Sequence, residues 1–586
     1  MALAHYPAVP PAIAMGCGII FVSSGSAWAI AAAAVCCMAA FIAAPATHPL
    51  GRWFTPAFAG LGAALTLMLA PAGMPAHMLD GQSHTVRGIV VAEQSYRGSQ
   101  RLVVRSDSMA GFRAIISVKE PSIRFATGDT VRVTGFIEPA DAHSRLPFQP
   151  PVHLSERSAA RLYAESGDIV LTGAAHGMHD LRHAILDRIY SSPLKDGSAA
   201  LLASAWLGDD GLETSTRERF QAAGLAHLLC VSGFHLAILA AVVAAMLIWL
   251  NLFPRLRLLR PAAVIAAAWL FAMLTGMRPP VIRAAVMLSV YMLARMAERD
   301  SVPLNSLATA AIVIMIINPY WIYSIGFQLS VTAVAGIILM APRLNPVQAT
   351  KKTQRLHNAM SLLCVPLAAQ IATAPVVLAH FHTLPLLGIP VNAMAIILFP
   401  PFMVSGAIAV GLSSAGFCPK GITALTDTLA VATDSLCDAA ASAQTGILSG
   451  IYLSEGTLAA LSAATVLTAA AMNMRGSYRK GSIVCALTAL AFAGCGCAPA
   501  REALFFSSPY SRCVGIRTPD SAVVISRNSY IPVALQRYFE AHGSVPTVTD
   551  SDFTIHGAAR RGNVLILGDK SYRLDSLPQK SCVSQF

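Results

Sequence analysis

The sequence predicts a polytopic α-helical membrane protein with a small external β domain and a short α/β C-terminal tail. Of its 586 residues, 55% are hydrophobic and only 12% are charged, whereas about 25% are charged in a typical soluble protein. The mean hydropathy is +0.59. Many apolar runs approach the roughly 20 residues that a spanning helix needs. One polar region instead shows apolar residues at every second position, which is typical of strands.

The first predicted unit, residues 1–76, consists of N-terminal transmembrane helices. Candidate helices are Val9–Ser24, Ala27–Ala44 and Pro56–Met74. Pro, Gly and single polar residues interrupt several apolar runs of the chain, and such interruptions are tolerated in lipid only where protein or a water-filled cavity covers the freed backbone. This favours a transporter or channel over a simple anchor.

Residues 77–175 are predicted to form the β domain. Apolar alternation in RLVVRS, RAIISVKE and TVRVTGFIE, with turns between them, indicates a small barrel or sandwich. From Asp80 to Asp168 the chain has 11 Lys and Arg against 10 Asp and Glu, so charge gives no support for strong phosphate binding by this domain.

Four aromatic residues of the β domain are candidates for stacking on nucleic-acid bases, although aromatic residues on strands more often pack in a core. They are Tyr96, Phe112, Phe125 and Phe136.

Residues 176–223 are predicted to form amphipathic interfacial helices. In LRHAILDRIY, Leu181, Ile185 and Ile189 fall on one helix face. Such helices lie at the membrane surface or pack on the spans.

Apolar runs then follow closely through a transmembrane block at residues 224–412 and further transmembrane helices at 413–500, before the polar tail at 501–586. The expected runs are Leu225–Leu250, Ala262–Thr275, Val281–Ala294, Leu304–Ile317, Ile322–Met340, Ala359–Leu378, Leu386–Leu412, Ile422–Gly446, Leu458–Met472 and Ser482–Ala498.

The net charge of +12 fits either basic cytoplasmic loops or an anionic substrate. The basic clusters Pro254–Arg260, Pro342–Arg355 and Arg475–Lys480 are expected in the cytoplasm by the positive-inside rule. Alternation of the spans then places the N-terminus inside, and the β domain and the C-terminal tail outside.

Polar residues inside the transmembrane block need partners. An Arg at the centre of a span costs roughly 2.5 to 3.5 kcal/mol on insertion scales. Arg283 follows the helix start at Pro279-Pro280, so it either reaches the outer interface or faces an internal aqueous path. Gln328, Gln370 and Asn392 also need partners. A bundle around a polar conduit satisfies all of them.

The stretch HLLCVSGFHLAIL opens the block and contains His227, Ser232, Gly233 and His235. On one α-helix the two histidines would be separated by about 80°, and Ser232 could contact His235. Three interpretations remain open: helix packing, lining or gating of a conduit, and a Ser–His hydrolytic dyad or metal site. The absence of Asp and Glu from this span weakens the third.

The order and spacing of these residues resemble the membrane competence domain of the ComEC competence proteins. The resemblance covers Leu201 to about Val410. It is carried by Gly224, His227, Ser232-Gly233, His235, Pro280, Arg283-Ala284, Pro303-Leu304-Asn305, Asn318-Pro319, Ser324, Gly326-Phe327-Gln328-Leu329-Ser330, Gln370, Pro375, Phe381 and Asn392. The β domain, which contains GDTVRVTGFIEP (Gly128–Pro139), resembles the external OB-like domain in the layout of that family.

The resemblance implies a bacterial inner-membrane channel that moves single-stranded DNA into the cytoplasm during natural transformation. Its channel or gate candidates are His227, Ser232, Gly233, His235, Arg278, Arg283, Gln328, Gln370 and Asn392. The alternatives are a transporter of another anionic or lipidic substrate, or an intramembrane Ser/His hydrolase.

Many family members also carry a metallo-β-lactamase-like domain, which needs an HxHxDH metal cluster. The tail holds only His542 and His556, so we expect no nuclease, catalytic residue, metal or cofactor. The chain has no GxxxxGK[ST] motif. The expected partners are single-stranded DNA, membrane lipid, an external DNA receptor, a competence pilus, a separate cytoplasmic ATPase or helicase, and a separate nuclease if the second strand is degraded.

Overall fold

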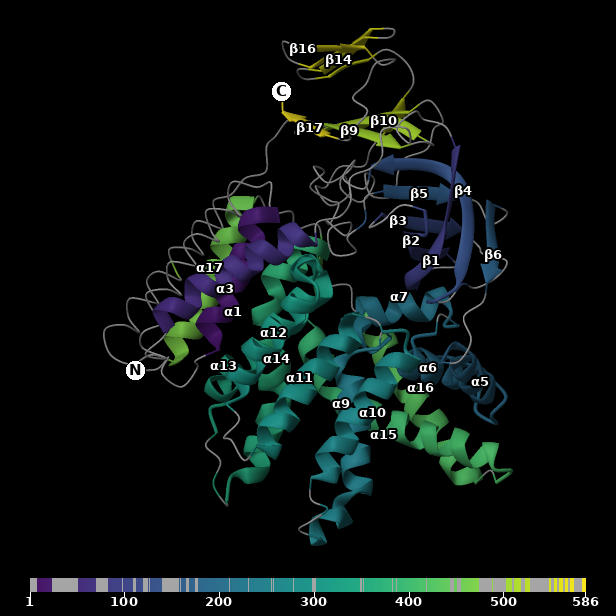
Figure 1. The fold of residues 1–586 in the computed structure, drawn as a ribbon, viewed down its shortest axis with the longest axis vertical. Coiled ribbons are helices and arrows are strands. Elements are labelled where there is room, and N and C mark those ends of the chain that lie inside the picture. The colour runs from purple at the N-terminus through teal and green to yellow at the C-terminus, as the bar shows by residue number, and fades with distance from the viewer. Residues whose placement is uncertain are drawn as a thin grey trace.

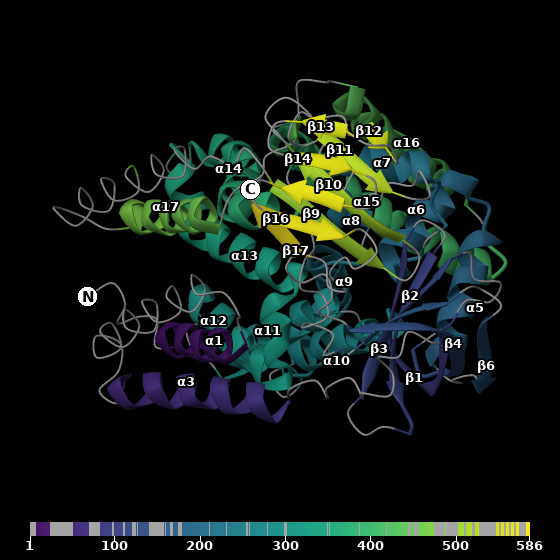
Figure 2. The same cartoon turned by 90° about the horizontal axis from the view of Figure 1, so that it is seen from above.

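The computed structural model describes residues 8–23 and 51–69, most of 83–139 and 158–473, residue 487, and strand residues within 502–585. Most of its helices gather in one body (Figure 1), while strands β1–β6 and β9–β17 lie toward one end of the molecule. Figure 2 shows the molecule from above, with α1 and α3 side by side at the edge of the helical body.

The β domain is a closed sheet. Its strands are β1 (Ser83–Tyr96), β2 (Ser99–Ser106), β3 (Arg113–Lys119), β4 (Thr130–Pro139), β5 (Ala160–Ala164) and β6 (Ile169–Gly173). They follow the order β1-β2-β3-β5-β4-β6, and β1 also pairs with β4, which closes the first five strands into a barrel. Strands β3 and β5 are parallel, and the other pairs in this sheet are antiparallel.

The alternation seen in the sequence becomes the inside and outside of this barrel. Val131 and Val133 are fully buried, whereas Arg132 between them is exposed. On β2, Leu102 and Val104 are fully buried, and Val103 between them is also buried. Successive side chains of a strand point to opposite faces, so these sequences form a barrel with an apolar interior.

The N-terminal helices α1 (Val9–Ser23) and α3 (Gly51–Met68) pack against one another. A Cβ at Gly18 would run into the carbonyl of Ala59, and one at Gly62 into the carbonyl of Met15. Small residues therefore let the two backbones approach closely, as in membrane helix pairs. The expected helix Ala27–Ala44 lies outside the described residues.

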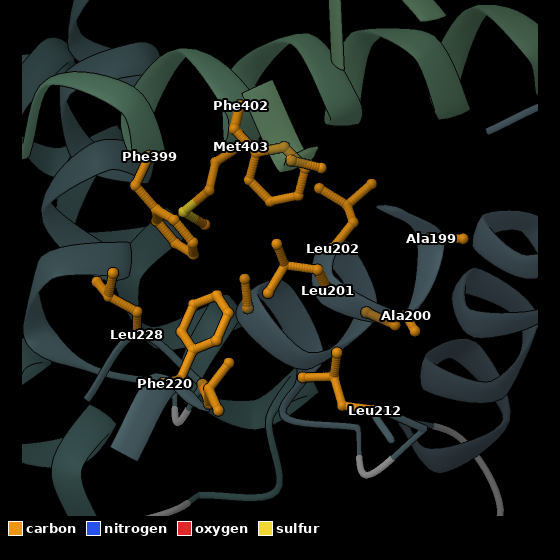
Figure 3. Close-up of a cluster of buried hydrophobic side chains, with 14 of the residues drawn as sticks. Ala199, Ala200, Leu201, Leu202, Leu212, Phe220, Leu228, Phe399, Phe402 and Met403 are labelled. Carbon is orange, nitrogen blue, oxygen red and sulfur yellow. The ribbon is translucent and has the colours of Figure 1, made fainter. Parts of the chain in front are cut away.

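Three helices follow the barrel: α5 (Met178–Tyr190), α6 (Asp196–Leu207) and α7 (Thr214–Ala222). Nearly all residues of helix α6 are buried in a core with α15 and α16, which agrees with the expectation that helices of this region pack on the apolar helices. In Figure 3, Leu201 and Leu202 face Phe402 and Met403 of α15.

The remaining helices correspond broadly to the expected apolar runs. They are α8 (Ala226–Leu229), α9 (Gly233–Met246), η5 (Ile248–Leu252), α10 (Leu259–Leu274), α11 (Pro279–Met296), α12 (Pro303–Ile317), η6 (Pro319–Tyr323), α13 (Ile325–Leu344), α14 (Gln354–Phe381), α15 (Gly388–Ser414), α16 (Lys420–Ser442) and α17 (Glu455–Asn473). Short strands β7 (Thr383–Pro385) and β8 (Ile447–Ser449) pair with each other.

Among the described residues, three helices are long and apolar enough to cross a membrane: α13, α14 and α15, with 20, 28 and 27 residues. Helix α16 is not one of them. It carries three aspartates, and Asp434 forms an ion pair with Arg219 of α7 at 3.1 Å.

The described part of the C-terminal tail is β-structure rather than the expected mixture of strand and helix. One sheet has the order β12-β11-β10-β9-β17 and the other β13-β14-β15-β16. The strands are β9 (Glu502–Ser508), β10 (Ser511–Arg517), β11 (Ala522–Ser526), β12 (Thr547–Thr549), β13 (Phe553–Ile555), β14 (Ala558–Arg561), β15 (Val564–Leu567), β16 (Lys570–Arg573) and β17 (Cys582–Gln585).

The contact between α13 and α14 yields a stability prediction. A Cβ at Gly336 would overlap the side chain of Ala372 and lie 2.8 Å from the carbonyl oxygen of Ala368. Gly336→Ala should therefore lower the free energy of unfolding by about 1 to 3 kcal/mol, the usual cost of overpacking. The measurement is the thermal melting of the purified protein in detergent.

The matched control is Gly411→Ala in α15, where a Cβ would meet nothing within 4 Å. This change should leave the protein as stable or stabilise it by up to about 1 kcal/mol, because Ala is the better helix former. Equal melting of the two variants would contradict close packing at Gly336.

Candidate functional site

The stretch His227–Leu239 does not form the single helix on which the two histidines were expected to lie. Helix α8 ends at Leu229 and α9 begins at Gly233. Ser232 between them is extended, with φ −129° and ψ 173°. The angular argument from one continuous helix is therefore wrong, although His227 and His235 remain close enough to interact electrostatically.

His235 stabilises the start of α9. Its side chain is fully buried, and its Nδ1 accepts a hydrogen bond of 3.0 Å from the backbone N–H of Ser232. A side chain three positions after the N-cap plays the same part in a capping box. The ring also packs on Phe399 of α15, with ring centroids 5.6 Å apart. His235 thus joins the helix start to the buried core.

The same geometry bears on the hydrolase alternative. Ser232 Oγ lies 3.3 Å from Nδ1 of His235, but that nitrogen already accepts the Ser232 backbone N–H. The other ring nitrogen, Nε2, is buried without a hydrogen-bond partner in the described structure. A catalytic histidine needs a free nitrogen for the serine proton and a group that orients the ring. The arrangement fits a helix cap.

His227 lies where three segments meet. Its side chain is exposed, and its ring forms a hydrogen bond with the backbone of Gly224. Gly224 has φ +78°, and a Cβ there would lie 3.2 Å from Pro385 Cγ and 3.4 Å from Gly388 Cα. The segment before α8 therefore lies directly against the turn between α14 and α15.

Gln370 and Asn392 bind that same turn. Gln370 Nε2 donates to the carbonyl of Pro385 at 2.8 Å, and Asn392 Nδ2 donates to the carbonyl of Gly388 at 2.6 Å. The structure therefore brings Gln370 and Asn392 together around one turn, and Gly224, three residues before His227, packs against it.

Gln328 belongs to a second polar group, on α13. Its Nε2 donates to the Ile322 carbonyl at 3.0 Å, and its Oε1 lies 3.1 Å from Nε2 of His380 near the end of α14. Sequence reasoning missed His380 as a site residue. Its place in His380-Phe381-His382, at the end of an apolar run, was the available signal.

Arg283 on α11 does not reach the outer interface. Only 2% of its surface is exposed, and its Nε is buried without a hydrogen-bond partner in the described structure. Its guanidinium lies against Gly326 at the start of α13: a Cβ at Gly326 would stand 2.8 Å from Nη2. Arg278 lies outside the described residues.

Gly233 and Ala284 connect the opening stretch with this arginine. A Cβ at Gly233 would lie 3.4 Å from the Ala284 side chain, which is ordinary contact distance. The start of α9 thus packs on α11 one residue away from Arg283.

Two of the four base-stacking candidates lie in the barrel core. Phe112 and Phe125 are 1% and 3% exposed, so their rings pack inside and do not present a face to a ligand. Tyr96 and Phe136 lie on β1 and β4, but their side chains are outside the described set. Within the described ranges, no three His, Cys, Asp or Glu side chains gather in a way that could hold a metal.

The capping contact of His235 can be tested by two substitutions. His235→Gln keeps a side-chain acceptor for the Ser232 N–H, as Gln does at this position of a capping box. It should melt close to the unsubstituted protein. His235→Ala loses the contact and the ring packing, and should cost about 1 to 3 kcal/mol. Equal losses in both variants would contradict the capping role.

The comparisons with known proteins fall on this region. Residues 206–477 match the family model described as "Competence protein". The chain is 29% identical over 223 residues to "ComE operon protein 3" of Bacillus subtilis (strain 168). The aligned region covers 37% of this chain and 27% of that protein. It is 26% identical over 211 residues to "Uncharacterized protein YcaI" of Escherichia coli (strain K12), covering 35% of this chain and 28% of that protein.

The matches therefore span less than a third of either relative. No solved structure matches the chain. The family match nevertheless includes α9 to α17 and every polar contact described above for His227, His235, Arg283, Gln328, Gln370 and Asn392. The long apolar helices α13, α14 and α15 lie within the matched residues, so this part of the chain is similar to the competence protein family and has helices long and apolar enough to cross a membrane.

Proposed function

We propose that this protein is an inner-membrane channel that moves single-stranded DNA into the cytoplasm during natural transformation. The observation that carries the proposal is one of position. The residues matched by the competence family include all three described helices that are long and apolar enough to cross a membrane, and also the buried His235 and Arg283.

The chemistry of those groups suits a path for a polyanion. DNA carries a charge at every phosphate, and an ionised group is very costly in lipid. Within the described structure, Gln328, Gln370 and Asn392 use their amide N–H groups on carbonyls of the bundle itself. They face inward, as intramembrane polar residues generally do.

The barrel is proposed to be an external OB-like domain. A five-stranded closed barrel is the architecture of the OB fold, and the closure of β1 on β4 gives such a barrel here. Its near neutrality and the buried Phe112 and Phe125 favour a role in presenting or positioning DNA over tight binding.

Transport needs components beyond this chain, whose role in the whole machine is itself a proposal. We propose an external DNA receptor and a competence pilus on the outer side, and a separate cytoplasmic ATPase or helicase as the source of energy. A separate nuclease would degrade the second strand.

The test follows labelled double-stranded DNA in a strain that lacks the gene and is complemented with variants. His227→Ala is the informative change, because His227 is exposed and does not cap α9. The proposal expects DNase-resistant label to stay in the periplasm for the deletion strain and for His227→Ala, with protein abundance unchanged. His183→Ala on α5, outside residues 206–477, is the control and should behave like the unsubstituted protein.

A cytoplasmic label that is the same with and without the gene would overturn the channel proposal for DNA. The transporter of another anionic or lipidic substrate would then become the better explanation of the same polar groups. Normal uptake by His227→Ala in the presence of a deletion phenotype would remove His227 from the path but leave the channel.

A further inference from the structure

Arg283 is a buried cation without a partner. No described residue forms an ion pair or hydrogen bond with its guanidinium, and Nε is enclosed by protein. Helices α11 and α13 contain no Asp or Glu. Buried charges in proteins are normally paired, because removing a charge from water is costly. Among the described residues the guanidinium therefore has no counter-ion.

The surface that Arg283 faces is itself suited to an anion. Its guanidinium lies beside Gly326 in the first turn of α13, a helix of 20 residues. The first N–H groups of a helix have no partner within the helix. Ser324 at the N-cap makes no side-chain capping bond, and no described residue accepts from the N–H of Ile325, Gly326 or Phe327.

A cation at this place is unfavourable on its own. The N-terminus of a helix carries partial positive charge, so the helix start and the guanidinium repel each other. An anion between them removes the repulsion and gains hydrogen bonds from both sides, as phosphates do at other helix N-termini.

We propose that Arg283 and the first backbone N–H groups of α13 form a phosphate subsite that holds a phosphodiester of the DNA strand. That the bound phosphate belongs to DNA rests on the proposed channel function. Gly326 is a specificity-determining part of the site, because a Cβ would stand 2.8 Å from Nη2 of Arg283 and would crowd both the guanidinium and the donors.

The first experiment measures binding of short fluorescent oligothymidylate to the purified full chain in phosphatidylcholine nanodiscs. Arg283→Gln and Gly326→Ala should each weaken binding about tenfold or more, the expected loss for a charge-assisted contact. Arg283→Gln should also reduce the slope of log affinity against log salt by about one.

Two matched controls should bind like the unsubstituted protein. Arg295→Gln removes an equal charge from an exposed position on the same helix. Gly411→Ala adds a methyl group where a Cβ meets nothing within 4 Å. Equal weakening by Arg283→Gln and Arg295→Gln would overturn the subsite in favour of general charge attraction.

A second measurement keeps folding separate from binding. Without anions, Arg283→Met should melt at a higher temperature than the unsubstituted protein, because it removes an unpaired buried charge. Inorganic phosphate should raise the melting temperature of the unsubstituted protein and leave that of Arg283→Met unchanged. The same rise in both proteins would overturn the proposal.

The uptake assay separates this inference from the proposed function. A deletion phenotype with normal uptake and binding by Arg283→Gln would refute the subsite and leave the channel. Phosphate-dependent melting that requires Arg283, without any deletion phenotype, would establish an anion site and refute the channel. If phosphatidylglycerol in the nanodisc displaces the oligonucleotide only when Arg283 is present, the ligand is a lipid headgroup and the DNA assignment falls.

Discussion

The requirement that an apolar bundle satisfy its own polar backbone groups underlies the central part of this structure. At two breaks between helices, a polar side chain supplies a hydrogen bond to the backbone. His235 accepts from Ser232 at the break before α9, and Gln370 donates to Pro385 at the turn after α14. In lipid, unsatisfied groups of this kind would be too costly to tolerate, so these breaks and their partners form a single unit.

Local patterns allowed the barrel and several helix starts to be predicted. The period-two alternation around Val131 and Val133 became the barrel interior, and Pro279-Pro280 does open α11. Proline preorganises a first turn, and alternation is a property of one strand, so both signals are present in a few consecutive residues.

Other features depend on contacts between distant segments and were not accessible from sequence pattern. The run Leu225–Leu250 carries no charged Asp, Glu, Lys or Arg and was expected as one span, whereas the break at Ser232 depends on the His235 ring and its packing on Phe399. Likewise the sequence left open whether α6 lies at the membrane surface or packs on the apolar helices, and it is buried because α15 and α16 cover its faces. The membership of His380 in a polar group depends on α13 lying beside α14.

The closure of the barrel also governs how this part of the molecule can meet other chains. Strands β1, β2, β3 and β5 each have two neighbours and β4 has three, since β4 pairs with β1, β5 and β6, and within this sheet β6 is bound on one side only. Unpaired strand edges recruit other strands and promote aggregation. Since β6 has only five residues, the barrel offers a neighbouring chain little edge to pair with, and sheet growth from this domain is disfavoured.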